Sequence, residues 1–162
     1  MVAVEICHLY ISPGHNFVGH AGREPDTHPA IEVPRIECVA GRGIRGDRYF
    51  DFKDNYKGQI TFFSLEVFDE LCAALGLEGC APSLVRRNVF TRNLDLNDLI
   101  GKEFEIQGVR FHGTQECAPC YWMDRALAPG AEKFLKGRGG LRARILCDGE
   151  LRSTPVITAA GC

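Results

Sequence analysis

The sequence has 162 residues, of which 45% are apolar and 25% are charged, a composition typical of one globular domain with its own core. The net charge of -2 argues against a general nucleic-acid binder, which usually carries a clear basic excess. No stretch approaches the roughly 18 apolar residues that cross a membrane, and residues 1–10 lack the basic start and apolar run of a signal peptide. We therefore expect a single cytoplasmic domain over residues 1–162, with neither a membrane nor a nucleic acid as its partner.

The first third of the chain predicts strands joined by a long loop. Alternating apolar residues predict a strand over residues 2–11 and a short one over residues 36–39. The segment between them, residues 12–34, is rich in Gly, Pro and His and predicts a loop. Residues 41–48 then place three glycines beside three arginines, which predicts tight backbone turns next to a cluster of positive charge.

The best-patterned helix begins after a buried strand that we expect over residues 59–63. Ser64 can cap its first turn, and Glu66 is favourable there because a helix N-terminus attracts negative charge. Apolar residues keep helical spacing as far as Leu75, and Gly76 is a natural C-terminal stop.

The second half of the chain is mostly β in pattern. Residues 88–91 predict a strand, and the dipeptides Gln107-Gly108 and Asp148-Gly149 are strong signals of two-residue hairpins. The strand pairs expected around these turns are 104–106 with 109–111, and 141–147 with 150–152. Residues 121–127 and 132–135 predict short helical turns.

Together these elements predict a mainly β fold with a few short helices. Several short strands and two hairpins favour a closed β-barrel, because closure removes exposed strand edges.

The basic residues are unevenly chosen, since fourteen are Arg and only five are Lys. Arginine is the better residue where a planar fork must hold a phosphate or carboxylate. Nine arginines fall in three short stretches: 42, 45 and 48; 86, 87 and 92; 138, 142 and 144. The stretches are either three solvated loop ends or the parts of one anion site.

The spacing of Cys117 and Cys120 lets both sulfurs meet one centre. A thioredoxin-like redox pair is one interpretation, but only 42 residues follow Cys120 and the upstream segment is a predicted hairpin. A structural zinc site normally needs four ligands, and no second pair completes the set. Two packed thiols are a third interpretation. In the fourth, nearby arginines stabilise a thiolate that binds a soft metal or carries sulfur.

Successive blocks of the sequence resemble those of MOSC domains, a family named after the C-terminal region of molybdenum cofactor sulfurases. In chain order the blocks are 46–48, 59–64, 86–88, 117–120 and 138–149. Each block is weak alone, but the ordered set spans roughly residues 33–152. The resemblance implies a MOSC-type β-barrel that holds a pterin-based molybdenum cofactor or handles sulfur destined for it.

The resemblance also implies roles for particular residues. Cys120 matches the cysteine that ligates molybdenum in amidoxime-reducing relatives, and is therefore the expected catalytic and metal-binding residue. Arg86 and Asn88 match the phosphate and pterin pocket, Arg48 matches a cofactor-phosphate arginine, and Ser64 a pocket hydroxyl. A donor that the relatives carry at the position of Ala118 is absent from this sequence.

Two functions of different classes follow from the resemblance. The first is a molybdenum-dependent reductase of small N-hydroxylated compounds, with electrons from a partner protein because no nicotinamide, flavin or iron–sulfur motif occurs in the sequence. The alternative is a sulfur carrier with a persulfide on Cys120, supplied by a sulfur donor, or a cofactor-binding module in molybdenum cofactor metabolism.

Other polar residues have less specific signals. Asp47 is expected to orient Arg48 or to cap a turn, and Glu116 is a proton-donor hypothesis because it neighbours the thiols. The histidines of the long loop, His15, His20 and His28, have irregular spacing that favours solvated side chains over a substrate mouth.

Overall fold

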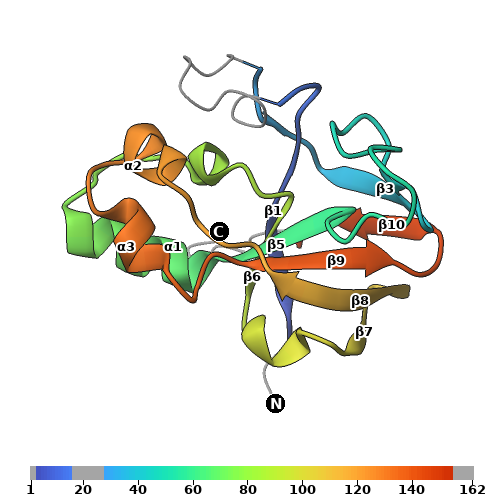
Figure 1. Ribbon diagram of the computed structural model, residues 1–162. Coiled ribbons are helices and arrows are strands. Elements are labelled where there is room, and N and C mark those ends of the chain that lie inside the picture. The colour runs from blue at the N-terminus through green and yellow to red at the C-terminus, as the bar shows by residue number, and fades with distance from the viewer. Residues whose placement is uncertain (1–2, 16–27, 155–162) are drawn as a thin grey trace, which may run out of the picture.

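The computed structural model describes residues 3–15 and 28–154 (Figure 1). Its strands are β1 (Glu5–Ile11), β2 (Ile31–Glu32), β3 (Arg35–Val39), β4 (Gly43–Ile44), β5 (Ile60–Ser64), β6 (Val89–Arg92), β7 (Glu103–Ile106), β8 (Val109–Glu116), β9 (Leu141–Ile145) and β10 (Gly149–Arg152). Its helices are α1 (Leu65–Leu75), α2 (Trp122–Ala126) and α3 (Ala131–Leu135), with the 3-10 turns η1 (Pro82–Val85) and η2 (Asn97–Leu99). The mainly β prediction is confirmed.

The strands form two sheets, and the predicted closed barrel is wrong for the part of the chain that the structure describes. The larger sheet has seven strands in the order β2-β1-β6-β5-β9-β8-β7, and the smaller one has three in the order β10-β3-β4. Strands β5 and β6 are parallel, and every other pair between named strands is antiparallel. A barrel requires the first and last strands to pair. Here the larger sheet ends at the two-residue β2 and at β7, and the second sheet covers one of its faces instead.

One of the two predicted hairpins is confirmed. Strands β7 and β8 pair across Gln107 and Gly108, which both have positive φ angles, as a tight turn of this kind requires. The other hairpin is wrong, because β10 leaves β9 and pairs with β3, with Leu151 opposite Ile36. The carboxylate of Asp148 accepts a hydrogen bond from the backbone N–H of Ala40 at 2.8 Å, which directs the chain towards β3.

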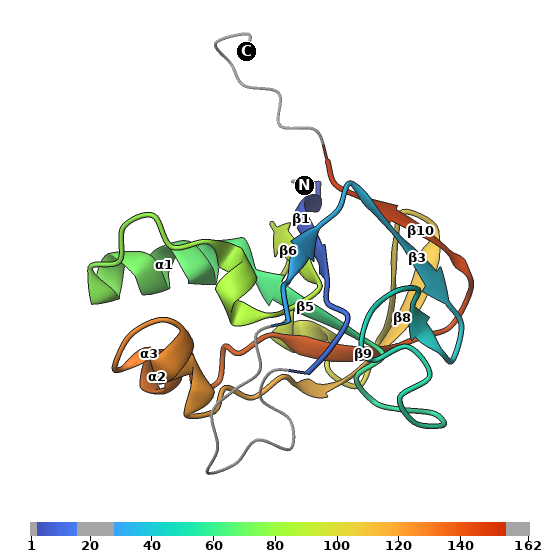
Figure 2. The ribbon, with the colours of Figure 1, turned by 90° about the horizontal axis from the view of Figure 1, so that it is seen from above.

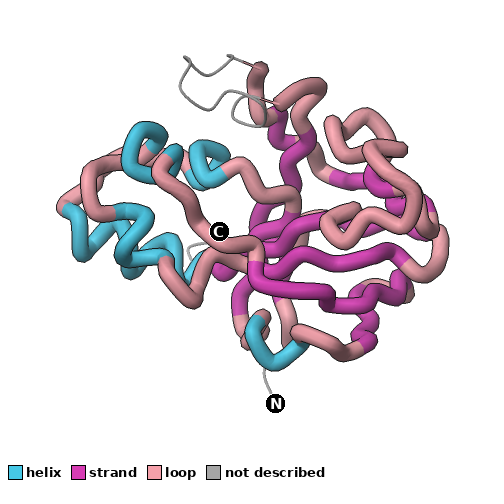
Figure 3. The backbone as a smooth tube through the Cα atoms, in the orientation of Figure 1, coloured by secondary structure: helices cyan, strands magenta, loops and turns pink. Residues whose placement is uncertain are grey.

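The core has two parts, one on each face of the larger sheet. Phe62 belongs to the cluster between the two sheets, whereas Phe63 belongs to the cluster between the larger sheet and the helices. Consecutive residues of a strand point to opposite faces, so the buried residues of β5 supply both clusters. Figure 2 shows α1, α2 and α3 on one side of β5 and β9, and β3 and β10 on the other. In Figure 3, the cyan helices at the positions of α1, α2 and α3 lie on one side of the magenta strands.

Helix α1 has the ends that its sequence predicts. The Ser64 hydroxyl accepts a hydrogen bond from the Val67 backbone N–H at 3.2 Å, and Gly76 ends the helix in the left-handed conformation with φ of 64°. Leu65, Phe68 and Leu71 are buried against the sheet. Within the described ranges, no helix has the length and apolar character needed to cross a membrane.

We predict that Gly140→Ala lowers the free energy of unfolding by about 3 kcal/mol or more. Gly140 has φ of 103°, and a Cβ there would overlap the carbonyl oxygen of Phe62. The cost combines left-handed backbone strain of about 1–2 kcal/mol with overpacking of roughly 1–3 kcal/mol. Gly137→Ala is the matched control, because its φ is 80° but nothing lies within 4 Å of the added Cβ. Urea unfolding should give the control only the backbone cost, and equal losses in the two variants would contradict the prediction.

Candidate functional site

A cavity of about 140 Å³ lies where the three predicted arginine stretches converge. One stretch contributes Arg48, the second contributes Arg86 and Arg87, and the third contributes Arg142. Cys120 lines the same cavity. The tertiary structure therefore brings together three of the five residues that the sequence predicted for the site, namely Arg48, Arg86 and Cys120.

Asp47 fixes Arg48 from beneath the cavity. The Asp47 carboxylate has no exposed surface, and its Oδ1 lies 3.2 Å from Nη1 of Arg48. The same carboxylate accepts backbone N–H bonds from Ser12 and Tyr49, at 3.0 and 3.2 Å. The orienting role predicted for Asp47 agrees with these contacts. The Arg48 guanidinium also stacks over the Tyr49 ring, 4.9 Å from its centroid, so its plane is held on two sides.

Within the part of the chain that the structure describes, Arg86 is held in the cavity wall by backbone oxygens and a hydroxyl, without a carboxylate partner. It has left-handed φ of 57° at the end of η1, and its guanidinium donates to His28 O at 2.9 Å, Gly14 O at 2.9 Å and Ser12 Oγ at 2.7 Å. Burial, followed by the charge of Arg48, lowers the pKa of Arg86 to about 10. Arg86 therefore remains a cation at neutral pH beside a second cation, an arrangement that favours a bound anion.

Asn88 lies beneath the cavity instead of lining it. Its amide oxygen accepts hydrogen bonds from the Thr61 backbone N–H at 3.0 Å and from the Thr61 hydroxyl at 3.1 Å. Its amide nitrogen donates to Tyr10 O at 3.1 Å and to Asp47 Oδ1 at 3.4 Å. These contacts use the full hydrogen-bonding capacity of the side chain. Asn88 thus supports Thr61, which does line the cavity, and a direct cofactor contact for Asn88 stays a prediction.

The two cysteines have different environments. Cys117 is buried and Cys120 is exposed, although both line the cavity. Burial by itself would lower the pKa of Arg142, but Cys117, Tyr56 and Tyr49 together raise it by more, so the net shift is upward. The guanidinium of Arg142 therefore lies beside Cys117, and Cys120 is the more accessible of the two thiols.

Arg87 holds the backbone of the cysteine segment. Its buried guanidinium donates to Cys117 O at 3.1 Å, Gly139 O at 3.1 Å and Val85 O at 2.9 Å. A hydrogen bond from Cys117 N to Gly140 O, 2.8 Å long, adds a further tie to the same segment. These bonds fix the start of the cysteine loop relative to η1 and to the chain before β9.

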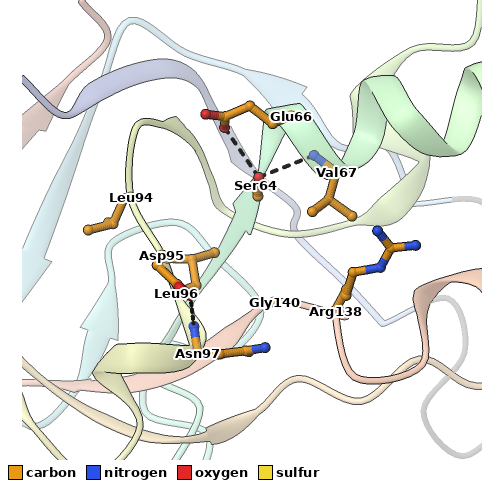
Figure 4. A pocket seen from close by; sticks show the side chains of 9 residues that line it. All are labelled: Ser64, Glu66, Val67, Leu94, Asp95, Leu96, Asn97, Arg138 and Gly140. Atoms are coloured by element: carbon orange, nitrogen blue, oxygen red, sulfur yellow. Dashed lines mark hydrogen bonds between the residues drawn. The ribbon is translucent and has the colours of Figure 1, made fainter. Parts of the chain in front are cut away.

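Ser64 lines a different cavity from the other predicted site residues. That cavity has a volume of about 390 Å³, and Glu66, Asp95 and Arg138 are also in its wall (Figure 4). The Ser64 hydroxyl caps α1 and lies 3.2 Å from Oε1 of Glu66. Its geometry is that of a helix cap, and its role as a cofactor contact is untested.

The sequence analysis missed the aromatic part of the site. Tyr49 and Tyr56 line the cavity and stack on each other with ring centroids 5.5 Å apart, and Trp122 lines it as well. His15, one of the loop histidines whose spacing favoured a solvated side chain, also lines the cavity with its Nδ1 buried, whereas His20 lies outside the described residues. No helical or strand periodicity marks the loop that carries Tyr49 and Tyr56. The position of Trp122 close behind Cys120 was the one available signal.

The part of the chain that the structure describes contains no set of side chains that could ligate a structural zinc ion. Over residues 3–15 and 28–154, no group of three or more His, Cys, Asp or Glu side chains could hold a metal ion. The thioredoxin-like interpretation also fails, because Cys117 and Cys120 follow an antiparallel strand and precede a helix of only five residues.

We predict that Ser64→Ala lowers the free energy of unfolding by about 1 kcal/mol, the usual cost of a lost N-cap, and leaves anion binding at the arginine cavity unchanged. Ser64→Thr keeps the capping hydroxyl and should recover most of the loss. Urea unfolding and sulfate titration of both variants provide the measurement. Weaker anion binding at unchanged stability would show that Ser64 acts on the ligand instead.

Comparison with known proteins identifies the family. The family model described as the MOSC domain matches residues 47–158. Among solved structures, the chain is similar to the YuaD protein of Bacillus subtilis, with 20% identity and a TM-score of 0.71 over 93% of this chain and 91% of that one. It is also similar to YiiM of Geobacillus stearothermophilus, with 14% identity and a TM-score of 0.66 over 98% of this chain and 78% of that one. For YiiM of Escherichia coli the identity is 14% and the TM-score 0.60, over 92% of this chain and 64% of that one.

At these identities the structural likeness concerns the fold alone. Comparison with curated protein sequences gave no significant match. The family match covers more than half of the sequence, and its residues include Arg48, Arg86 and Cys120. The chain belongs to the MOSC domain family.

Proposed function

We propose that this protein binds a molybdenum cofactor at the arginine cavity and acts as a reductase of small N-hydroxylated compounds. The MOSC family is associated with this cofactor. The observation that carries the proposal is the position of the exposed Cys120 thiol on a cavity whose wall also contains Arg48 and Arg86. A soft thiolate suits a soft metal centre, and paired guanidinium groups suit a phosphate.

The chemistry of the cavity fits such a cofactor. Arg48 and Arg86 would hold its phosphate, and Cys120 would ligate the metal. In addition, Nδ1 of His15 is buried without a hydrogen-bond partner among the described residues. The enclosed volume of about 140 Å³ is below the roughly 300–1,000 Å³ of typical small-molecule sites, so the cavity would enclose only part of the cofactor. The remainder would lie at the mouth, beside the exposed Cys120.

When bound, the cofactor supplies a two-electron redox centre. Reduction of an N–OH group consumes two electrons and two protons and releases its oxygen as water. In this proposal an electron-transfer partner supplies the electrons, because the sequence contains no motif for a nicotinamide, flavin or iron–sulfur group. The chain itself would hold the cofactor with Arg48 and Arg86 and present the Cys120 sulfur to the metal, and Trp122 in the cavity wall would limit access of water.

A sulfur-carrier function is the second candidate, and the exposure of Cys120 supports it. An accessible thiol can accept a sulfane sulfur from a donor and hold it as a persulfide. The buried Cys117, which interacts with Arg142, is less suited to meet a donor protein. The two candidate functions place the same cysteine at the centre but differ in whether metal is retained.

We predict that Cys120→Ser abolishes function, whereas Cys117→Ser retains much of it. Both proteins are produced in cells that make the molybdenum cofactor, then assayed for molybdenum, pterin, persulfide and reduction of an N-hydroxylated base. Stoichiometric molybdenum in the unmodified protein supports the reductase, and transferable sulfur without metal supports the carrier. Unimpaired function in Cys120→Ser would remove the basis of both proposals. Equal loss in the two variants would favour a dithiol mechanism.

We further predict that Arg86→Ala weakens cofactor retention by roughly 1.5–3 kcal/mol, the usual value of a hydrogen bond to a charged group. Arg138→Ala is the matched control, because Arg138 pairs with the exposed Glu70 and lines the cavity of Ser64 instead. Pterin content after dialysis measures the effect. Similar losses in the two variants would argue against a phosphate site at Arg86.

A further inference from the structure

His15 lies in the wall of the arginine cavity with a nitrogen that has no partner. Its Nδ1 atom is buried and makes no hydrogen bond within the described part of the chain. The ring packs edge-on against Tyr49, with centroids 4.9 Å apart, and against Phe52 at 5.2 Å. Because these contacts fix the imidazole, it does not simply turn towards solvent. A buried polar atom without a partner usually has a functional explanation, such as a ligand that completes it.

The charges that face His15 are mostly positive. Arg48, Arg86 and His28 disfavour a proton on its imidazole, and Asp47 favours one. Burial is the largest effect, followed by Arg48, and the net result is a pKa below the ordinary value of 6.5. His15 is therefore neutral at pH 7 in the free protein, with two arginine cations in the same cavity.

We infer that His15 is the third donor of an oxyanion subsite formed with Arg48 and Arg86, and that it takes up one proton from solvent when the oxyanion binds. This inference deepens the proposed function, on which it rests, by making occupation of the cofactor-phosphate position depend on pH. A bound dianion offsets the two guanidinium charges and accepts the imidazole N–H, so both effects favour the protonated ring. The pKa of His15 is then higher in the bound state than in the free state, and affinity increases as the pH falls.

Glu116, the proton donor suggested by sequence position, lies elsewhere. It lines a separate cavity of about 470 Å³ with Ala118 and Pro119, and its carboxylate accepts a hydrogen bond from Gly139 N at 3.1 Å. The geometry therefore favours His15 as the titrating group of the arginine cavity.

The test uses sulfate, because it remains a dianion from about pH 5.5 to pH 7.5, whereas phosphate changes its own charge in that range. Calorimetric titration in two buffers of different ionisation enthalpy measures both the affinity and the protons taken up per sulfate. We expect tighter binding at the lower pH, with uptake approaching one proton. If the pKa of His15 is one unit higher in the bound state, the affinity for sulfate at low pH is about tenfold greater than at high pH.

The variant His15→Gln keeps a hydrogen-bonding side chain but does not titrate, so its sulfate affinity should be weaker and independent of pH. His28→Gln is the matched control from the same loop. It should keep the pH dependence, because His28 contacts Arg86 through its backbone carbonyl and its charge has the smallest of the effects on the pKa of His15. If His15→Gln does not fold, the His15 ring nitrogens of the unmodified protein, followed by NMR with and without sulfate, decide the result. Their pKa should rise when sulfate is added.

The outcomes separate the two proposals. Sulfate binding that is independent of pH, or a pH dependence that survives in His15→Gln, would overturn the role of His15 while leaving the arginine site intact. No sulfate binding at any pH would overturn the oxyanion subsite and, with it, the phosphate role of Arg48 and Arg86.

Discussion

The buried carboxylate of Asp47 holds together the parts of the chain on which the site depends. It bonds to the backbone just after β1 through Ser12, to Arg48 and Tyr49 in the following loop, and to Asn88 just before β6. Removing one partner of a buried ion pair usually costs about 3–5 kcal/mol, because the remaining charge has no compensation. The Asp47–Arg48 pair has little exposed surface. The pair therefore positions the Arg48 guanidinium as well as contributing to stability. Asn88 extends the same network to Thr61 in β5.

The arginines around this network divide into two groups by their partners. Arg42, Arg92 and Arg138 pair with exposed carboxylates on the surface, where such pairs contribute little. Arg86 and Arg87 bond mainly to backbone carbonyls. Placing Arg86 beside Arg48 and His15 opposes folding through repulsion between like charges, and such clusters are common at binding sites. An anion in the cavity would offset this cost. Cys117 and the exposed Cys120 line the same cavity.

The relation to other MOSC proteins is one of shared fold with divergent sequence. Identities of 14–20% accompany structural overlap of most of the chain. A shared fold does not by itself assign chemistry, so function must be argued from the side chains that the fold brings together. In this chain one cavity wall brings together the Cys120 thiol, Arg48, Arg86 and His15, on which the proposed function is argued.

The sequence by itself determined several local elements and pointed to the arginines and the cysteine of the cavity. Helix α1, with Ser64 and Gly76 at its ends, and the β7–β8 turn at Gln107-Gly108 depend on nearby residues, so their patterns were sufficient. The ordered blocks also indicated the family. Tertiary structure decided which arginines of the three stretches line the cavity, because that depends on contacts between residues far apart in the chain. It separated Ser64 from Cys120 and placed Asn88 beneath the site, since local spacing carries no information on which side of a sheet a loop returns. It also paired β10 with β3 instead of β9, because the bond from Ala40 to Asp148 spans 108 positions and has no local signature.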